Sequence, residues 1–212
     1  MPFQIDEYLR LRPFAYHVTS RNNLLLLRSS RRLRTAASVI RDADAQHLTT
    51  LRRDREHTLV TPAGQIVLKD QRPLIAANLE LAAGWSLGDF VEYLNSFTYF
   101  WPGNDRGPIG QGQRLLDHYE ADSPAVLRCR TQDLLESNRD LAPQFCPFNS
   151  GAPRYHSGRR ARRGPNLFQS AALFPRRASE VIELGFRGDV ELPTSTLVRT
   201  PSGWSNISRL AN

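Results

Sequence analysis

Lysine, cysteine and long apolar runs are scarce in this sequence of 212 residues. Lys69 is its only lysine, and Cys129 and Cys146 are its only cysteines. The two cysteines form no CxxC pair or Cys/His cluster, so we expect no metal site and infer a reducing compartment. No apolar run approaches the roughly 20 residues of a membrane span, so we expect no membrane partner. Residues 1–12 are charged and lack the apolar centre of a signal peptide, which predicts a cytoplasmic protein.

The signatures of several hydrolase classes are absent as well. The chain contains no GxxxxGK[ST] phosphate-binding loop and no GxSxG nucleophile elbow, and Gly110-Gln111-Gly112 does not form a phosphate-binding signature. His118 and His156 lack an HExxH context. These absences argue against P-loop NTPases, α/β-hydrolases and zinc proteases.

Arginine accounts for nearly all of the positive charge, and the formal net charge is +7. The planar guanidinium suits phosphates and nucleic acid. A GC-rich genome that favours arginine codons would give the same composition without any function. Net charge alone does not separate these two explanations.

The length and the 40% hydrophobic content predict a single domain over residues 1–212. The patterns predict helices at 6–12, 22–28, 36–43, 86–94, 109–119 and 131–137, the last capped by Thr131. They predict strands at 14–19, 58–60, 66–68, 97–101, 125–130, 181–186 and 196–199, with a hairpin at Pro62-Ala63-Gly64. We expect the strand at 97–101 to stop at Pro102-Gly103 and residues 147–166 to form a long loop. Without regular βαβ alternation, the class expected is α+β.

Polar residues gather at the end of the first predicted strand and just beyond it. His17 and Thr19 share one face of that strand, and Asn23 follows closely. Such a group can bind a ribose or an amide. A histidine that satisfies a local backbone group would produce the same pattern.

The predicted strand 97–101 is aromatic. Tyr99 and Trp101 share one of its faces, and such a face can stack on a base or a nicotinamide ring. For Phe97 and Phe100, ordinary core packing is the better interpretation.

A dense basic segment follows Asn149-Ser150-Gly151. In a flexible, glycine-rich loop, arginines suit phosphate contacts, and a solvated surface loop is the alternative. As nucleic-acid-binding candidates we take Arg154, Arg159, Arg160, Arg162 and Arg163.

Two carboxylates, Glu180 and Glu183, precede or begin the late strand. Alternation places them on opposite faces, so we do not expect them to act as a pair. One of them can lie in a cleft while the other lies in solvent.

The order of these motifs resembles the DarT-like branch of the ADP-ribosyltransferases. His17-Val18-Thr19 with Asn23-Leu24 is similar to the opening of DarT-type enzymes, and the helix at 89–93 before the aromatic strand is similar to their next block. An uncharacterised set of DarT-related bacterial domains is more similar still. The similar segments are Lys69-Asp70-Gln71-Arg72-Pro73-Leu74, Leu94-Asn95 leading to Tyr99-Phe100-Trp101-Pro102, Asn149-Ser150-Gly151, Arg163-Gly164-Pro165-Asn166-Leu167-Phe168 and Val181-Ile182-Glu183-Leu184. The resemblance covers residues 14–192.

The resemblance implies an ADP-ribosyltransferase-like fold: a split, mostly antiparallel β core with flanking helices and NAD in the central cleft. It implies that His17, Thr19 and Asn23 contact NAD at its ribose and nicotinamide end, and that Tyr99 packs on the nicotinamide. Glu183 becomes the catalytic glutamate. The resemblance also places Arg72 near the diphosphate or the acceptor, as a second catalytic residue. Glu180 is the alternate for the catalytic glutamate, because one step in strand register exchanges Glu180 and Glu183.

The reaction implied is NAD-dependent transfer of ADP-ribose to a nucleic-acid acceptor, by a toxin or defence effector with an antitoxin protein as partner. The chain departs from the DarT pattern in the acceptor region. Gly103-Asn104-Asp105-Arg106 replaces a Pro-Arg-Ser-Pro-Met-like run, and Asn166-Leu167-Phe168 lacks a hydroxyl at its centre. The acceptor therefore stays open between DNA, RNA, protein and a small molecule.

Two other hypotheses remain. One is a non-catalytic module on the same fold that holds a nucleotide or nucleic acid through the arginine loop. The other is related chemistry such as RNA 2′-phosphotransfer, for which the spacing of basic residues offers no match.

Overall fold

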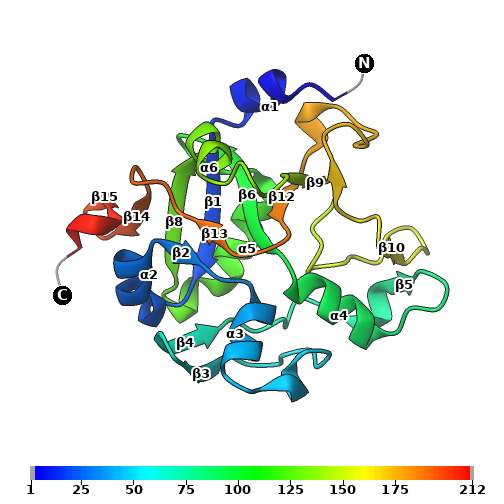
Figure 1. Cartoon of the computed structure of the whole chain (residues 1–212). Helices are drawn as coiled ribbons and strands as arrows, with labels where there is room; N and C mark the ends of the chain where they lie inside the picture. The colour runs from blue at the N-terminus through cyan, green and yellow to red at the C-terminus, as the bar shows by residue number, and fades with distance from the viewer. Residues whose placement is uncertain (1–2, 211–212) are drawn as a thin grey trace.

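The computed structural model describes residues 3–210, so the ends of the expected domain, 1–2 and 211–212, lie outside it. It is an α+β protein whose sheets are almost entirely antiparallel (Figure 1). The six α-helices within residues 3–210 are α1 (Ile5–Leu11), α2 (Leu24–Ser30), α3 (Ala36–Asp42), α4 (Leu87–Asn95), α5 (Gly110–Tyr119) and α6 (Thr131–Ser137). The coarse fold class expected from the sequence is confirmed. None of the helices within residues 3–210 is long and apolar enough to cross a membrane.

A nine-stranded sheet forms the centre of the molecule, in the order β11-β9-β12-β6-β1-β8-β14-β15 with β7 attached to β6. Its strands are β1 (Phe14–Thr19), β6 (Thr98–Asn104), β7 (Gly107–Pro108), β8 (Ala125–Arg130), β9 (Gln144–Cys146), β11 (Gln169–Ser170), β12 (Glu183–Phe186), β14 (Leu197–Thr200) and β15 (Gly203–Asn206). Three two-stranded sheets surround it. They pair β2 (Arg32–Leu33) with β13 (Val190–Glu191), β3 (His57–Thr61) with β4 (Gly64–Leu68), and β5 (Leu79–Leu81) with β10 (Ala161–Arg163).

The two middle strands of the sheet pair over a short stretch only. Strand β1 pairs with β8 over its whole length, from Phe14 to Thr19. It pairs with β6 over three residues and stops at Tyr16 opposite Trp101, although both strands continue. The sheet is therefore opened between β1 and β6 at the carboxyl end of β1.

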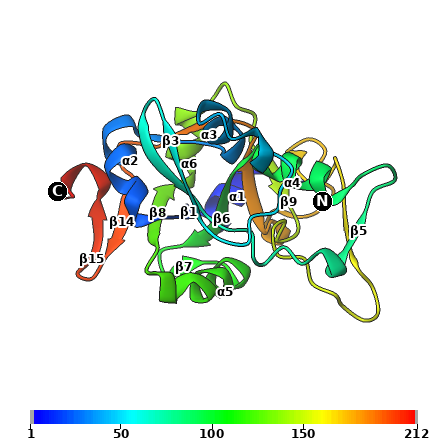
Figure 2. The same ribbon diagram turned by 90° about the horizontal axis from the view of Figure 1, so that it is seen from below.

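Helices pack on both faces of this sheet. Strand alternation places Ala15, Leu127 and Phe100 in the larger core, where α2 and α6 cover them. The other face packs against α5 through Tyr16 and Leu116. Figure 2 shows α2 and α3 on one side of β1 and β6, and α5 on the other.

The hairpin β3–β4 lies over the opening between the middle strands. Its two-residue turn and its register, with Thr61 opposite Gly64, confirm the hairpin expected from the sequence. The buried amide of Asn23 holds it in place, because it donates to the Val67 carbonyl at 2.9 Å and accepts from the Val67 amide at 2.8 Å.

Strand β6 runs through Pro102-Gly103, so the prediction that it stops there was wrong. Proline lacks a ladder donor, but at this point the pairing of β6 with β12 has already ended at Phe100. Gly103 is needed because β7 folds back closely: a Cβ there would lie 2.2 Å from the Gly107 carbonyl oxygen. The tight hairpin that joins β6 to β7 turns two residues later, at Asp105-Arg106.

Three smaller expectations also need correction. Thr131 does not cap its helix, because its hydroxyl donates to the Arg12 carbonyl at 2.6 Å. The loop expected at 147–166 contains the short strand β10, which pairs with β5. Glu180 lies before the strand, in the 3-10 turn Ala178–Glu180, and its carboxylate accepts from the Arg177 amide.

Candidate functional site

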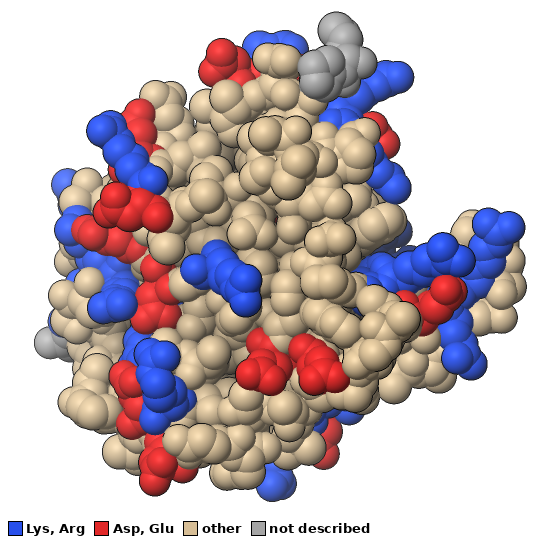
Figure 3. All heavy atoms as spheres, turned by 45° about the vertical axis from the view of Figure 1, so that its right-hand side comes forward, with Lys and Arg blue, Asp and Glu red and all other residues tan. Residues whose placement is uncertain are grey.

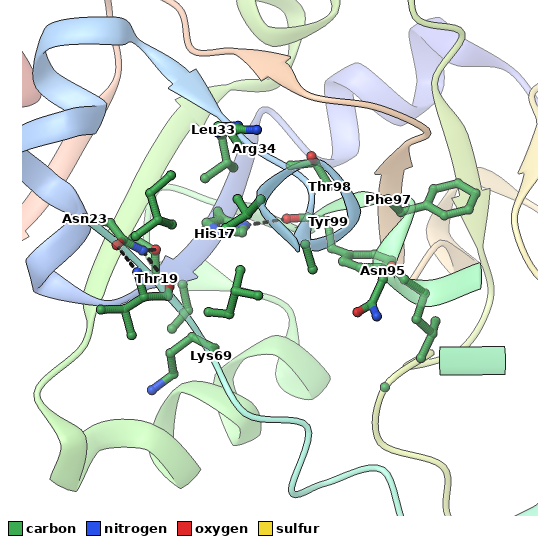
Figure 4. Close-up of a pocket in the computed structure, with 18 of the residues that line it drawn as sticks. His17, Thr19, Asn23, Leu33, Arg34, Lys69, Asn95, Phe97, Thr98 and Tyr99 are labelled. Carbon is green, nitrogen blue, oxygen red and sulfur yellow. Dashed lines mark hydrogen bonds between the residues drawn. The ribbon is translucent and has the colours of Figure 1, made fainter. Parts of the chain in front are cut away.

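A cavity of about 550 Å³ lies where β1 and β6 stop pairing. That size is typical of small-molecule sites. The strands contribute His17, Thr19, Tyr99 and Trp101, while α2, α3 and the β3–β4 hairpin cover the cavity with apolar side chains. Glu183 also lines it. Figure 4 shows His17, Thr19, Tyr99 and Asn95 around this space.

His17 is bonded to the neighbouring strand across the opening. Its Nδ1 lies 2.7 Å from the Tyr99 carbonyl oxygen (Figure 4). Because a carbonyl only accepts, Nδ1 carries the proton and Nε2 is the acceptor. Burial lowers the pKa of His17 from 6.5 to about 4. The ring is thus neutral at physiological pH and can accept a hydrogen bond.

Thr19 and Asn23 belong to the clamp that holds the hairpin. The Asn23 amide donates to Thr19 Oγ1 at 2.9 Å, and its remaining polar atoms bond to Val67. Both residues line the cavity. Their first task is to fix the cavity wall, and only Thr19 has a hydroxyl proton left to donate.

Tyr99 supplies the aromatic wall that the sequence predicts. Its ring lies 5.5 Å from that of Phe168 and 6.0 Å from that of Phe97, measured between centroids. Its hydroxyl donates to the Leu94 carbonyl. The ring is thus fixed at both ends, and Phe97 and Phe100 are buried core residues as expected.

Glu183 is a buried acid at the first position of β12, with 3% of its surface exposed. Burial raises its pKa from 4.5 to about 7. Hydrogen bonds from the Ser150 hydroxyl and from the Ser150 amide, which donates to Oε2 at 3.1 Å, and the charge of Arg163 lower the pKa. The Trp101 indole N–H lies near this carboxyl, is buried, and has no hydrogen-bond partner within residues 3–210. A carboxyl that titrates near neutrality can both stabilise positive charge and exchange a proton. The expectation that one glutamate lies in a cleft and the other in solvent is confirmed.

Arg53 is a cavity residue that the sequence interpretation missed. It is 6% exposed, and it donates to two neutral oxygens, Asn95 Oδ1 at 2.9 Å and the Lys69 carbonyl at 3.0 Å. Within residues 3–210 it makes no ion pair. Burial lowers the pKa of Arg53 to about 10, although the negative charge of Asp70 partly offsets that shift. An anionic ligand in the cavity would offset more of the cost of burying the cation.

Arg72, by contrast, is fully paired and lies outside the set of cavity-lining residues. Its guanidinium contacts Asp70 at 3.0 Å and Asp122 at 2.9 Å. Asp122 also lies 3.6 Å from the Lys69 ammonium. These pairs fasten segment 69–72 to the turn after α5, which is a structural role at the cavity rim.

The five arginines of the basic segment line a second, larger hollow of about 1440 Å³, which we call the arginine groove. Its opposite wall is α5, with Arg114 and His118. Lys and Arg side chains gather on the projection at the right of Figure 3, the region of β5 and β10 in Figure 1. Four of the five arginines are exposed, whereas Arg163 is 6% exposed. The groove therefore presents positive charge to solvent beside the cavity.

The donor set of the cavity suits an organic anion better than a metal. No group of three or more His, Cys, Asp or Glu residues within 3–210 could hold a metal ion. The cavity instead offers one buried cation, a neutral imidazole, an aromatic wall and a carboxyl that titrates near neutrality.

Comparison with known protein families identifies a family for this chain. No curated protein and no solved structure matches the chain. Residues 13–196 match a sequence family described as "Family of unknown function (DUF7002)". That match spans all the residues described around the cavity and the groove. The chain belongs to this family, DUF7002.

Proposed function

We propose that the protein is an NAD-dependent ADP-ribosyltransferase with a nucleic-acid acceptor. The observation that carries the proposal is that two buried groups of opposite charge line one cavity: the Arg53 cation, which makes no ion pair within residues 3–210, and the Glu183 carboxyl, whose pKa is raised. A dinucleotide supplies the diphosphate that Arg53 lacks and the ribosyl centre that a carboxylate stabilises.

Each cavity group has a role in this reaction. The bond between ribose C1′ and the nicotinamide nitrogen breaks, and nicotinamide leaves with the electron pair. The charge that develops on the ribose is stabilised by the Glu183 carboxylate, which also accepts the proton of the attacking acceptor. The Nε2 of His17 accepts a hydrogen bond from a ribose hydroxyl, and Tyr99 packs on the nicotinamide.

Arg53 takes the diphosphate role in this proposal, in place of the role first expected for Arg72. Arg72 is neutralised by two carboxylates and sits at the rim. Arg53 lines the cavity and makes no ion pair within residues 3–210. The opening between β1 and β6 also supports the split β core that the ADP-ribosyltransferase resemblance implies.

The arginine groove would hold the acceptor. It adjoins the cavity, because Pro73, Leu115 and Asn149 line both. Exposed guanidinium groups bind a phosphate backbone without reading its sequence. A non-catalytic binding module is the weaker alternative, because it needs no carboxyl buried in the cavity.

The test is release of nicotinamide from NAD in the presence of DNA or RNA, with Glu183→Gln beside wild type. We expect Glu183→Gln to lower the rate by about a hundredfold or more, since it removes the charge that stabilises the transition state. Glu180→Gln is the matched control and should leave the rate unchanged. Turnover that survives in Glu183→Gln, or its absence from wild type with every acceptor, contradicts the proposal.

A further inference from the structure

The turn at 148–150 carries the backbone donor of Glu183. Strand β9 ends at Cys146, and Ser150 donates its amide to Glu183 Oε2 at 3.1 Å, while the Ser150 hydroxyl also bonds to Glu183. Within the turn, Asn149 Oδ1 accepts from the Ala152 amide at 3.1 Å, and the Phe148 amide bonds to Cys146. A contact from outside the turn adds to this local support.

Arg163 contacts the two residues of this turn that precede Ser150. Its Nη2 donates to the Asn149 carbonyl at 3.0 Å, and its guanidinium lies 5.1 Å from the centre of the Phe148 ring. Arg176 approaches the same ring, also at 5.1 Å. Because Arg163 belongs to β10, which pairs with β5, its backbone is anchored independently of the turn.

The environment of Arg163 differs from that of the other arginines in its segment. It is 6% exposed, and its Nε is buried with no hydrogen-bond partner within residues 3–210. Arg162, its neighbour, has 85% of its side chain exposed. An arginine that binds a polyanion does so from an exposed site, whereas an arginine that supports a buried carboxylate has to be buried beside it.

We infer that Arg163 is a positioning residue for Glu183, and not one of the nucleic-acid contacts of the groove. It fixes the turn through Asn149 and Phe148 and so keeps the Ser150 amide on the carboxylate. Its charge also favours the ionised form of the Glu183 carboxyl. The inference rests on the proposed function only in taking Glu183 as the reactive carboxylate.

The test is an NMR titration of the isotope-labelled protein without NAD, following the Glu183 carboxyl carbon and the Ser150 amide from about pH 5 to about pH 9. In wild type, both signals should titrate with one midpoint. In Arg163→Met, the Glu183 midpoint should rise by about one pH unit, and the response of the Ser150 amide should shrink. Arg160→Met removes the same charge from an exposed site in the same segment and should change neither signal.

Two further variants keep the inference testable if Arg163→Met does not fold. Arg163→Lys retains the charge but not the two-donor geometry, so the Glu183 midpoint should stay near that of wild type while the Ser150 amide response falls. Phe148→Leu leaves every charge in place at a partly exposed site and should weaken the Ser150 response alone. Wild-type behaviour of both signals in these variants would overturn the inference. Since NAD is absent, this result is independent of whether the protein turns NAD over.

Discussion

The cavity between β1 and β6 and the arginine groove share part of their walls, but the cavity buries its charged groups whereas the groove exposes most of its arginines. The groove exposes many arginines to solvent, where each has a small effect. The cavity holds one buried arginine, Arg53, and two buried carboxyls, Glu183 and Asp70, of which Asp70 is paired with Arg72. Desolvation makes Arg53 and Glu183 far more sensitive to a ligand or to pH than the exposed arginines of the groove. The density of charge in the sequence thus indicates the groove, while the chemistry depends on isolated charges elsewhere.

The largest difference between the two regions should appear in protein stability at alkaline pH. The folded-state pKa of Glu183 lies near 7, above its ordinary value of 4.5, so its contribution to stability is full below about pH 4.5 and lost as pH rises through about 7. At pH 8, the free energy of unfolding of Glu183→Gln should therefore exceed that of wild type by up to about 3 kcal/mol. Near pH 4.5, the two proteins should be equally stable. Denaturant melts at both pH values measure this.

The exposed Glu180 is the control for that comparison. Glu180→Gln should differ from wild type equally at both pH values. A Glu183→Gln variant that is no more stable than wild type at pH 8 would mean that the carboxyl is ionised without penalty in the folded protein.

Substitutions at Arg53 and Arg72 compare the buried cation that has no ion pair with the cation that is paired to two carboxylates. Arg53→Gln should weaken NAD binding about 10- to 100-fold, because a charge-assisted hydrogen bond contributes about 1.5–3 kcal/mol. Arg72→Gln should change NAD affinity less than threefold or so, since its charge is already neutralised by Asp70 and Asp122. Calorimetric titration of both variants measures the two effects. Equal losses would remove the distinction between the cavity and its rim.

The pH dependence of turnover sharpens the same contrast. Only the ionised form of Glu183 stabilises the transition state, so NAD turnover should rise about tenfold between pH 6 and pH 8 and level off above. His17 stays neutral throughout, because its pKa lies near 4. Initial rates at constant ionic strength test this, and a rate that falls with rising pH in this range would argue against the carboxylate role.

Single groove arginines should have the smallest effect. Arg160→Gln should lower the slope of log affinity for DNA or RNA against log salt by about 0.7–0.9, and leave NAD affinity unchanged. Arg163→Gln should not follow this pattern if it supports Glu183. Salt titrations by fluorescence anisotropy distinguish them, and an Arg160→Gln slope equal to that of wild type would exclude the groove as the phosphate contact.

The sequence predicted those parts of the molecule that follow from local patterns. Strand alternation brought His17, Thr19 and Tyr99 to one cavity, and the β3–β4 hairpin followed from its turn residues. The choice between Glu180 and Glu183 stayed open in the sequence. It depended on where β12 begins, and the pairing of Glu183 with Cys146 fixes that start.

The remaining features depend on contacts that are distant in sequence. Arg53 lies in the charged run 52–56, which looks like solvent-exposed chain, and its partner Asn95 is 42 residues away. Arg163 has the same local composition as its exposed neighbours and differs only through Asn149 and Phe148. No local pattern distinguishes a buried arginine from a solvated one.

The most direct test of the cavity as an NAD site is calorimetric titration of NAD into wild type and His17→Ala, with thermal melts to confirm that both are folded. We predict micromolar binding to wild type and no measurable binding to His17→Ala. No heat of binding with folded wild type, or equal affinity in the two proteins, would contradict the account.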